Sequence, residues 1–282
     1  DLTYPVVDIG AGAPSLQEVL DGKHTFAEVL KKAERPMLIL GQGPLTRPDG
    51  AAILAAARQL AERFAMVEGD WNGCNVLHTA ASRVGGLELG LVPGDGGLDV
   101  AAMLEPKALD VVFLIGADEV ATTGLGDTFT VYMGTHGDRG VHAAVVILPG
   151  AAYTEKHGTW VNTEGRPQRA KLAVFPPGEA KEDWKILRAL SEALGRKVPL
   201  DTLGEVRRRM AEMAPTLGQV DTISAASFGA FGTDGEIGPE PFTSPITDFD
   251  LTNAIARASS VMRECSALFV HGGKTGATGT DG

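Results

Sequence analysis

The fold of this chain is decided largely by residues 144–169, which read AVVILPGAAYTEKHGTWVNTEGRPQR. The apolar run at 145–148 has the composition of a buried strand, and the proline–glycine pair that follows ends it. A polar segment punctuated by glycines then continues to Arg169. Because α/β proteins place ligand sites where a strand ends in a polar loop, this segment is the first candidate for a functional site.

Six polar residues of this segment form the candidate site: Glu155, Lys156, Asn162, Thr163, Glu164 and Arg166. One interpretation is a cradle for a pterin or nucleotide headgroup, oriented by backbone amides and amide side chains. The alternative is a polar loop that satisfies its own hydrogen bonds, in which Glu155 and Lys156 pair and Asn162 caps a turn. The residue pattern alone leaves both interpretations open.

Strands and helices alternate through the first part of the chain. Short apolar runs bounded by proline, glycine or aspartate predict strands at 37–40, 110–116, 128–133 and 145–148. Helical spacing predicts helices at 16–20, 26–34, 50–64, 75–86 and 99–104, with Ser15, Thr25 and Asp49 as N-caps. The alternation is typical of an α/β fold with a parallel, doubly wound sheet. Within 110–116, the continuous apolar run between Asp110 and Gly116 predicts a sheet that is covered on both faces.

The C-terminal part of the chain has a different character. Amphipathic spacing predicts helices at 182–194, 202–213 and 252–268, whereas residues 216–246 are rich in Gly, Ser, Thr and Pro. We interpret that stretch as a long loop lying on another surface, and residues 272–282 as a frayed end. We therefore expect an α/β domain at 1–180, followed by a helical and irregular C-terminal extension at 181–282.

The composition argues against several classes of function. A net charge of −11 and a pI near 5.0 disfavour binding to nucleic acid or anionic lipid, because both need a basic surface. No apolar run of the sequence approaches the roughly 20 residues that cross a bilayer. Three consecutive arginines, 207–209, complement the dipole of their predicted helix, although an acidic partner is the alternative.

Two nucleotide-binding motifs are incomplete. The turn after the first predicted strand has Gly41 and Gly43, but Thr46 stands where a Rossmann fingerprint needs its third glycine. Pro44 also removes a backbone donor that a phosphate would use. A Gly-Lys-Thr triplet near the C-terminus lacks the first glycine of a P-loop, because Leu268 occupies that position. We expect neither to bind a nucleotide.

The metal-ligating residue types are few and scattered. The two cysteines, Cys74 and Cys265, are predicted to be reduced, buried thiols. No His-x-x-x-His or Cys-x-x-Cys spacing occurs, although His136 and His142 flank a loop after a predicted strand. We expect no metal site and no catalytic residue in this chain. The six histidines are His24, His78, His136, His142, His157 and His271.

Several blocks of the chain, in order, resemble a known family: 35–41, 49–53, 71–78, 114–118, 134–140, 145–169, 182–186 and 248–259. This is the molybdopterin-dependent oxidoreductase family. The resemblance is closest to its pterin-free relatives in respiratory complex I, the family of the large iron–sulphur (G) subunits of NADH-quinone oxidoreductase. The resemblance covers most of the chain from about residue 35 to residue 268, and it implies a molybdopterin-oxidoreductase-like α/β domain at 1–180.

The resemblance implies a structural role in electron transfer from NADH to quinone. Subunits of that family carry 2Fe-2S and 4Fe-4S clusters on clustered cysteines in their N-terminal part, so such clusters are implied for a complete subunit. None is expected in this chain, because two cysteines cannot form a four-cysteine cluster. After Arg169 no β-barrel pattern follows to close a pterin pocket, so the six polar residues of the candidate site would be a vestigial pterin-type loop, without a cofactor.

The same resemblance gives expectations for the surroundings of the chain. Because it begins at Asp1 without an initiator Met or a leader, we expect it to be the C-terminal part of a longer polypeptide. Its expected partners are the other hydrophilic subunits of complex I and the cluster-bearing N-terminal part of its own subunit. The expected location is peripheral, on the cytoplasmic side of the bacterial inner membrane or the matrix side of the mitochondrial one. The loop at 216–246 is a candidate for a segment ordered by a partner.

Three alternative functions remain at this point. The first is the lobe of an active molybdopterin-dependent oxidoreductase of the formate dehydrogenase or nitrate reductase type, which bound molybdenum would reveal. The second is a free-standing nucleotide-binding module, which titration with NADH would test. The third is an acidic surface that recruits a soluble electron-transfer protein.

Overall fold

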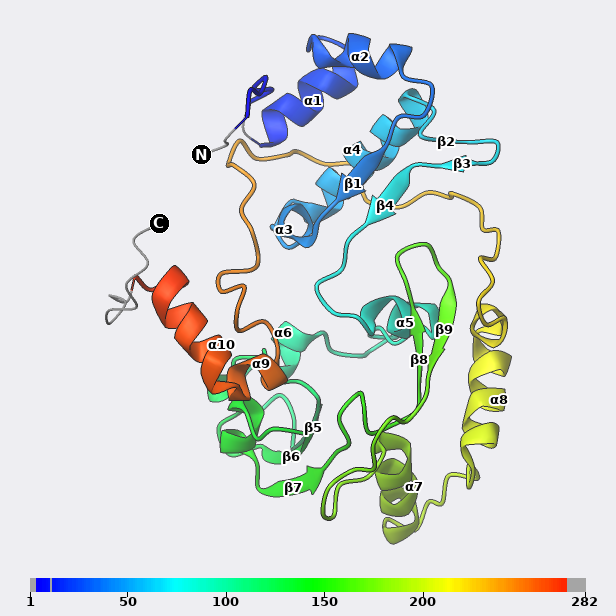
Figure 1. Cartoon of the computed structure of the whole chain (residues 1–282), viewed down its shortest axis with the longest axis vertical. Helices are drawn as coiled ribbons and strands as arrows, with labels where there is room; N and C mark the ends of the chain where they lie inside the picture. The colour runs from blue at the N-terminus through cyan, green and yellow to red at the C-terminus, as the bar shows by residue number, and fades with distance from the viewer. Residues whose placement is uncertain (1–3, 11, 273–282) are drawn as a thin grey trace. The chain divides into compact units, whose positions relative to one another are not determined.

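A computed structural model describes residues 4–10 and 12–272, and the chain divides into two compact units (Figure 1). The first unit contains Asp1–Val84, Val161–Arg166 and Ile223–Pro245, and the second contains Gly85–Trp160, Pro167–Thr222 and Ile246–Gly282. Each unit is thus assembled from three separate segments of chain. The domain boundary expected after residue 180 is a different division from these two units, and it stays a prediction.

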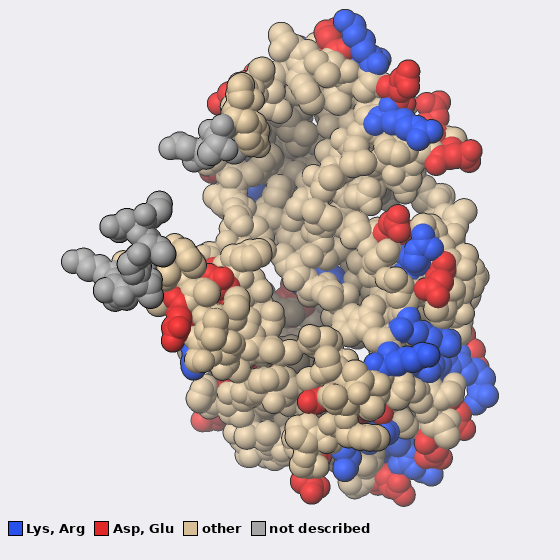
Figure 2. Space-filling view, viewed as in Figure 1, with Lys and Arg blue, Asp and Glu red and all other residues tan. Residues whose placement is uncertain are grey.

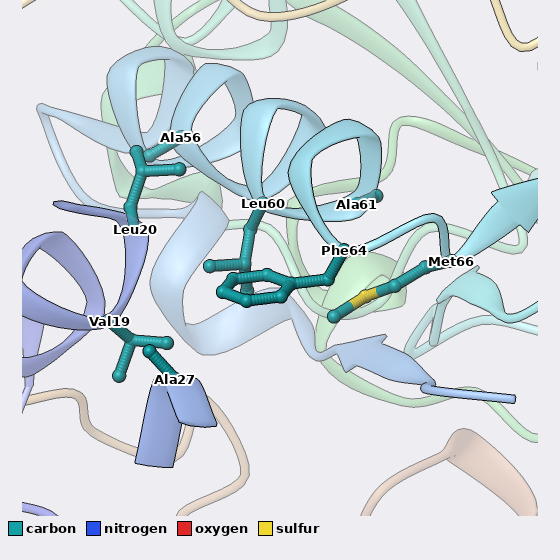
Figure 3. Close-up of a cluster of buried hydrophobic side chains, with 8 residues drawn as sticks. All are labelled: Val19, Leu20, Ala27, Ala56, Leu60, Ala61, Phe64 and Met66. Atoms are coloured by element: carbon teal, nitrogen blue, oxygen red, sulfur yellow. The ribbon is translucent and has the colours of Figure 1, made fainter. Parts of the chain in front are cut away.

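The first unit packs short helices around a small apolar core. Its elements are α1 (Ala13–Asp21), α2 (Phe26–Lys32), β1 (Leu38–Leu40), α3 (Gln42–Leu45), α4 (Gly50–Arg63), β2 (Val67–Glu68), β3 (Trp71–Asn72) and β4 (Cys74–Val76). α4 is rich in alanine, which favours the helix and lets neighbouring elements approach closely. Leu60 of α4 and Phe64, the residue after the helix, meet residues of α1 and α2 in the core (Figure 3). The buried cluster consists of Val19, Leu20, Ala27, Ala56, Leu60, Ala61, Phe64 and Met66.

The helix starts differ in detail from the sequence predictions. α1 begins at Ala13 after Gly12, so Ser15 lies inside the helix and does not cap it. Thr25 is the residue before α2, but its side chain makes no capping bond; His24 Nδ1 instead accepts a hydrogen bond from Phe26 N at 3.0 Å. The helical class of these segments was therefore predicted from their periodicity, whereas the residues at their ends were not.

The strands of the first unit form a parallel pair and a small hairpin. β1 pairs with β4 in parallel register, Leu38 opposite Cys74 and Leu40 opposite Val76, while β2 and β3 are antiparallel. The strand predicted at 37–40 is confirmed for 38–40, but the helix predicted at 75–86 is wrong over 75–82 and confirmed only for 83–86. Residues 74–76 are a strand because β1 supplies their ladder partners, and a helix, α5 (Arg83–Glu88), begins only at Arg83.

A long segment with neither helix nor strand lies along α4 within the first unit. Arg58 Nε donates to Phe231 O at 3.1 Å, and Thr233 N donates to Ala51 O at 3.0 Å. Gly232 has φ +76°, and a Cβ atom there would lie 2.3 Å from Ala55 N, so only glycine permits this approach. The loop predicted at 216–246 is therefore ordered against a surface of its own chain over these residues.

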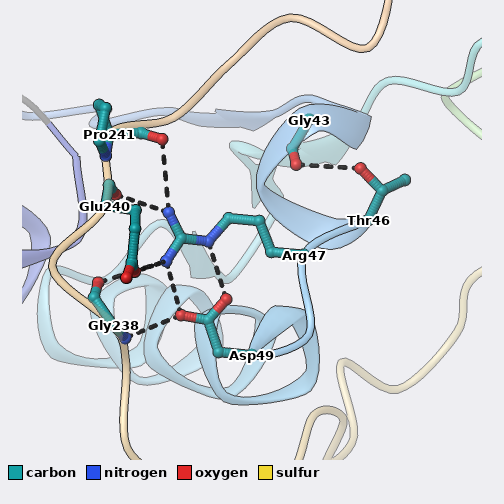
Figure 4. Close-up of polar contacts among 7 residues, drawn as sticks. All are labelled: Gly43, Thr46, Arg47, Asp49, Gly238, Glu240 and Pro241. Carbon is teal, nitrogen blue, oxygen red and sulfur yellow. Dashed lines mark hydrogen bonds and ion pairs between the residues drawn. The ribbon is translucent and has the colours of Figure 1, made fainter.

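Arg47 joins the segment at 228–241 to the start of α4 by hydrogen bonds (Figure 4). Its guanidinium donates to both carboxylate oxygens of Asp49 at 2.8 Å and to Glu240 O at 2.6 Å, and Gly238 N donates to Asp49 at 2.8 Å. Asp49 occupies the N-cap position of α4, but its side chain caps no helix amide, which corrects the prediction. The hydrogen bonds from Arg47 lower the pKa of Asp49 to about 2.

The remaining elements include a three-stranded parallel sheet. In chain order they are α6 (Val100–Met103), β5 (Val111–Ile115), η1 (Thr122–Leu125), β6 (Phe129–Gly134), η2 (Arg139–Ala143), β7 (Val146–Pro149), β8 (Gly158–Val161), β9 (Pro167–Ala170), α7 (Asp183–Ala193), α8 (Leu203–Met213), η3 (Pro215–Gly218), α9 (Ala254–Ala258), α10 (Ser260–Cys265) and η4 (Ser266–Val270). The order β5-β6-β7 places Phe113 opposite Val131, and Val131 opposite Val146. The strands predicted at 110–116, 128–133 and 145–148 are confirmed within a residue or two.

The sheet is not covered on both faces within the described residues. Leu114 is 5% exposed, but its neighbours on the other face of β5, Phe113 and Ile115, are 41% and 47% exposed. Right-handed crossovers that run in one direction across a sheet lie on the same face, so β5-β6-β7 leaves its second face without a connection. The prediction of two covered faces is wrong for this sheet. The sequence of β5 shows that its residues are apolar, but it does not show which elements pack on each face.

The C-terminal helices are confirmed with one change. α8 begins with a capping box, in which Thr202 Oγ1 accepts from Glu205 N at 3.2 Å and Glu205 Oε2 accepts from Thr202 N at 2.8 Å. The single helix predicted at 252–268 is instead α9, α10 and η4, because Ser259 is extended and caps α10. Apart from Gly272, the end predicted to be frayed lies outside the described residues. The architecture is mixed α/β with parallel sheets, and no helix in the described part of the chain is long and apolar enough to cross a membrane.

Candidate functional site

The six polar residues of the candidate site lie at the two ends of a β-hairpin. β8 and β9 form this hairpin, whereas the residue pattern predicted a polar loop without strands. Glu155 and Lys156 precede β8, whereas Asn162, Thr163, Glu164 and Arg166 form the turn after it. The intervening strand therefore separates the predicted cluster into two groups.

The turn of the hairpin is held by Asn162. Its Oδ1 atom accepts hydrogen bonds from the backbone N–H groups of Glu164 and Arg166, both at 3.0 Å. Glu164 also accepts from Asn162 Nδ2 at 3.2 Å and lies 3.6 Å from the guanidinium of Arg166. Gly165 has φ +83°, a conformation that favours glycine. Asn162 thus caps a turn, as the self-satisfied interpretation predicted, and Thr163 is exposed.

The base of the hairpin meets the N-terminus of α7. Lys156 Nζ donates to Asp183 Oδ2 at 2.5 Å, so its partner is Asp183 and not the predicted Glu155. Glu155 instead accepts a hydrogen bond from Ala152 N at 2.9 Å. These contacts join the chain before β8 to the first turn of α7, where a carboxylate is favoured by the helix dipole.

Glu182 is the buried acid of this region, with 5% of its surface exposed. Burial raises its pKa, but hydrogen bonds from Lys185, His157 N and Trp184 Nε1 outweigh burial and lower the pKa overall. His157 Nδ1 is buried and accepts or donates no hydrogen bond among the residues that the structure describes, although it lies 3.6 Å from Glu182 Oε2 and would form an ion pair with it when protonated. No sequence pattern pointed to Glu182, because its role depends on a hairpin base that is distant along the chain.

A hollow of about 310 Å³ lies between the base of the hairpin, the start of α7 and one side of α8. All of its lining residues belong to the second unit, and the polar ones are contributed by the hairpin base, α7 and Arg207. An apolar side is formed by α8. The lining residues are Lys156, His157, Gly158, Thr159, Glu182, Asp183, Trp184, Leu203, Val206, Arg207 and Met210.

The cysteines and histidines do not assemble into a ligand set in the described structure. Cys74 and Cys265 are both free and half-buried, so the prediction that they are buried is only partly met. Burial raises the pKa of the Cys74 thiol, which disfavours the thiolate that metals bind. His136 and His142 are exposed. Among residues 4–10 and 12–272, no group of three or more His, Cys, Asp or Glu side chains could hold a metal ion.

The carboxyl end of the parallel sheet is closed by a buried polar contact. Asp118, 3% exposed, accepts a hydrogen bond from Tyr132 Oη at 3.0 Å and another from Gly140 N at 3.0 Å. Burial, and then the charge of Asp118, raise the pKa of Tyr132 to about 12. Arg257 of α9 pairs with Asp138 and with Glu119, the latter at 2.7 Å. The edge at which α/β proteins bind ligands is therefore occupied by the chain's own side chains.

Comparison with known proteins decides the family. A molybdopterin oxidoreductase family model matches residues 1–193, more than half of the chain. The chain belongs to the molybdopterin oxidoreductase family. A second family model, which describes the C-terminal region of the G subunit of NADH-ubiquinone oxidoreductase, matches residues 220–265. The two matches follow one another along the sequence of this chain.

Individual relatives are similar over nearly the whole chain. It is 42% identical over 272 residues to the mitochondrial NADH dehydrogenase [ubiquinone] iron-sulfur protein 1 of Solanum tuberosum, covering 95% of the chain and 36% of that protein. It is 38% identical over 277 residues to the NADH-ubiquinone oxidoreductase 75 kDa subunit of Reclinomonas americana, covering 95% and 39%. It is 36% identical over 263 residues to the G subunit of the NADH-quinone oxidoreductase of Rickettsia bellii, covering 93% and 37%. The chain thus spans well under half the length of these relatives.

Proposed function

We propose that the chain is the structural C-terminal part of the large iron–sulphur subunit of a proton-translocating NADH:quinone oxidoreductase. One observation carries this proposal: a molybdopterin oxidoreductase match over 1–193 is followed by a match to the C-terminal region of the G subunit over 220–265. Active molybdopterin enzymes would account for the first match but not for the second. The names of the relatives, all of them parts of NADH oxidoreductases, support the same assignment.

The residues of the hairpin do not fit a pterin cofactor. In a pterin cradle, Lys156 and the amide of Asn162 would face the ligand, but Lys156 is bonded to Asp183 and Asn162 to Glu164. Releasing either would leave a charge or an amide without its partner, which costs about 1–3 kcal/mol for each group. We therefore propose that the six polar residues are vestigial and serve the packing of the hairpin.

The role of the chain is to support electron transfer without a redox group of its own. With two cysteines in 282 residues, it lacks the four thiolates of a cluster, and the iron–sulphur clusters of the enzyme are assigned to the remainder of the subunit. In this proposal the α/β part at 1–180 belongs to a doubly wound domain completed elsewhere in the polypeptide, and 181–282 is an extension. Its partners are hydrophilic subunits, at the cytoplasmic or matrix face of the membrane.

The proposal is tested on the complete polypeptide purified with its natural assembly from membranes. We expect the assembly to oxidise NADH with a quinone analogue and to contain iron, with neither molybdenum nor a pterin in stoichiometric amount. Metal analysis and fluorescence of the oxidised pterin measure the last two. One molybdenum or tungsten atom with a pterin for each polypeptide would instead favour the formate dehydrogenase or nitrate reductase type of enzyme.

A nucleotide-binding module is distinguished by a direct titration. We expect the chain in its complete polypeptide, separated from other subunits, to show no saturable binding of NADH. The physical reason is that Pro44 and Thr46 replace a backbone donor and a glycine that a pyrophosphate site needs. Saturable binding that is lost on substitution in the turn at 41–46 would contradict the proposal.

A further inference from the structure

The hollow beside α8 has an apolar side and a cationic side chain, Arg207, that pairs with no other residue in the described part of the chain. Leu203, Val206 and Met210 lie three or four residues apart, on one face of α8, and Trp184 joins them from α7. These side chains are half-buried, so each still presents apolar surface to the hollow. A second apolar side chain entering the hollow would remove this surface from water, which is the main driving force for docking.

The charges around the hollow do not cancel. Both acids are already paired: Asp183 lies 2.5 Å from Lys156 Nζ, and Glu182 lies 2.8 Å from Lys185 Nζ. Arg207 also lines the hollow, but its guanidinium has no hydrogen bond or ion pair among the described residues. Lys185 is not part of the lining but neutralises Glu182, so three cationic side chains meet two acids among the described residues. One positive charge is therefore in excess beside the apolar side.

Positive charge continues along the surface of α8 beyond the hollow. Arg208 and Arg209 are exposed, and of the two only Arg209 has an ion pair in the described part of the chain, with Glu212 at 3.3 Å. Figure 2 shows Lys and Arg side chains gathered over α8. In a chain with a net charge of −11, a run of three arginines is a local reversal of sign. Such a patch attracts acidic groups and repels basic ones.

One further polar atom at the hollow has no hydrogen bond to any of the described residues. His157 Nδ1 is buried, and its nearest acidic atom, Glu182 Oε2, is 3.6 Å away, beyond hydrogen-bond distance. Buried ring nitrogens are normally satisfied, so this atom points to a group that is absent from the isolated chain. A partner that brings an acceptor or a hydroxyl into the hollow would satisfy it.

We propose that the hollow and the arginines of α8 form a docking slot for an acidic segment of a partner polypeptide. An apolar side chain of that segment enters the hollow against Leu203, Val206 and Met210, and a neighbouring carboxylate pairs with Arg207. A volume of about 310 Å³ suits one large side chain with its neighbouring polar group, being roughly ten times the volume that one water occupies. A polypeptide is favoured over a small carboxylate because the positive charge extends along α8 outside the hollow. The inference rests on the proposed function only in supposing that the chain has protein neighbours.

The test is photo-cross-linking within the intact assembly. p-Benzoylphenylalanine replaces Met210 in the complete polypeptide, the assembly is purified and irradiated, and mass spectrometry identifies the attached peptide. We expect an adduct with another chain, at an apolar residue that has Asp or Glu within two positions. An adduct with this chain, with a small molecule, or with a segment that lacks acidic residues would overturn the proposal, as would the absence of any adduct.

Charge variants make the test specific. Arg207→Glu is expected to reduce the adduct at least fivefold, whereas Arg207→Lys retains most of it, and the matched control Arg196→Glu, an exposed arginine outside the lining, leaves it unchanged. An adduct that is equally abundant in all three would refute the role of Arg207. If Arg207→Glu does not assemble, the salt dependence of the polypeptide that keeps Arg207 tests the proposal instead. Its yield of cross-linked adduct must fall as the salt concentration is raised from about 0.05 to about 0.5 M.

Failure of the docking slot and failure of the proposed function give different results. NADH oxidation and iron content of the purified assembly report on the function and do not depend on the adduct. An assembly that oxidises NADH but gives no acidic adduct removes the docking slot alone. An assembly without iron or NADH oxidation removes the proposed function, while the identity of the adduct still tests the slot.

Discussion

Replacing Tyr132 by Phe tests the polar contact that closes the sheet. Tyr132 is 1% exposed and Asp118 3%, and the bond from the phenol to the carboxylate is 3.0 Å long. The substitution removes the hydroxyl and leaves one oxygen of a buried carboxylate with one donor fewer. Loss of a hydrogen bond to a charged group costs about 1.5–3 kcal/mol, so we expect the free energy of unfolding of the second unit to fall by that amount at pH 7.

The same contact predicts a dependence on alkaline pH. Burial and Asp118 raise the pKa of Tyr132 from 10.0 to about 12, so the folded chain retains a proton that the unfolded chain releases. The stabilising contribution is fully present below pH 10 and is lost as pH rises through 12, with a total of about 3 kcal/mol for two pKa units. Tyr132→Phe has no phenol to ionise, so its stability changes less over this range.

Hydrogen exchange of peptides from β5 and β6 measures both effects, because these strands report on the second unit alone. The matched control is Tyr153→Phe, since Tyr153 is 61% exposed and should lose nothing measurable. The reasoning is refuted if Tyr132→Phe exchanges like the unsubstituted chain at pH 7. It is equally refuted if both chains lose protection in parallel between pH 10 and pH 12.

Three further perturbations test the apolar core of the first unit, the turn of the β8–β9 hairpin and the segment at 228–241. Leu60→Ala removes a side chain that is 5% exposed and should cost about 2–5 kcal/mol in urea unfolding, whereas Val29→Ala, at a position 57% exposed, should cost little; equal losses would contradict the assigned core. Gly165→Ala, at φ +83°, should destabilise the hairpin turn by about 1–2 kcal/mol, and Gly41→Ala, where a Cβ meets nothing within 4 Å, should not; exchange of the β8–β9 peptides distinguishes them. The pKa of Asp49, lowered from 3.8 to about 2 by the hydrogen bonds from Arg47, predicts that the segment at 228–241 is held above pH 3.8 and released as pH falls through 2; limited pepsin digestion that is independent of pH over this range would contradict it.

The parts of the fold that were predicted correctly depend on residues that are close together in the sequence. The apolar runs of β5, β6 and β7 are bounded by glycine, proline or aspartate, so both their class and their limits are encoded locally. The capping box of Thr202 and Glu205 similarly sets the start of α8 within four residues of chain. The family resemblance was also visible, because it is a property of the residues and their order.

The errors arise where a partner lies far away in the chain. Residues 74–76 have the helical periodicity of their neighbours, but β1 provides a parallel ladder for them. Aspartate is a common N-cap residue, yet the carboxylate of Asp49 accepts hydrogen bonds from Arg47 and from Gly238 N instead. Gly238 is distant in the sequence. Propensity is a weak preference of less than about 1 kcal/mol for each residue, so a set of long-range hydrogen bonds outweighs it.

The candidate site was predicted only in part for the same reason. The turn at Asn162 is a local structure, and its asparagine and glycine indicate it. The pairing of Lys156 with Asp183, the buried Glu182 and the hollow beside Arg207 bring together residues from the hairpin base, α7 and α8. No local pattern specifies that meeting.

The sequence alone determined the class of the elements, the family and the scarcity of metal-binding thiols, since composition and short-range periodicity are complete in the chain itself. The tertiary structure decided which polar groups satisfy one another and which have no partner within residues 4–10 and 12–272, such as Arg207 and His157 Nδ1. The physical reason is that a charge or a hydrogen-bonding group acquires its role from whatever lies within about 3–4 Å of it. In a folded chain that neighbour is chosen by packing.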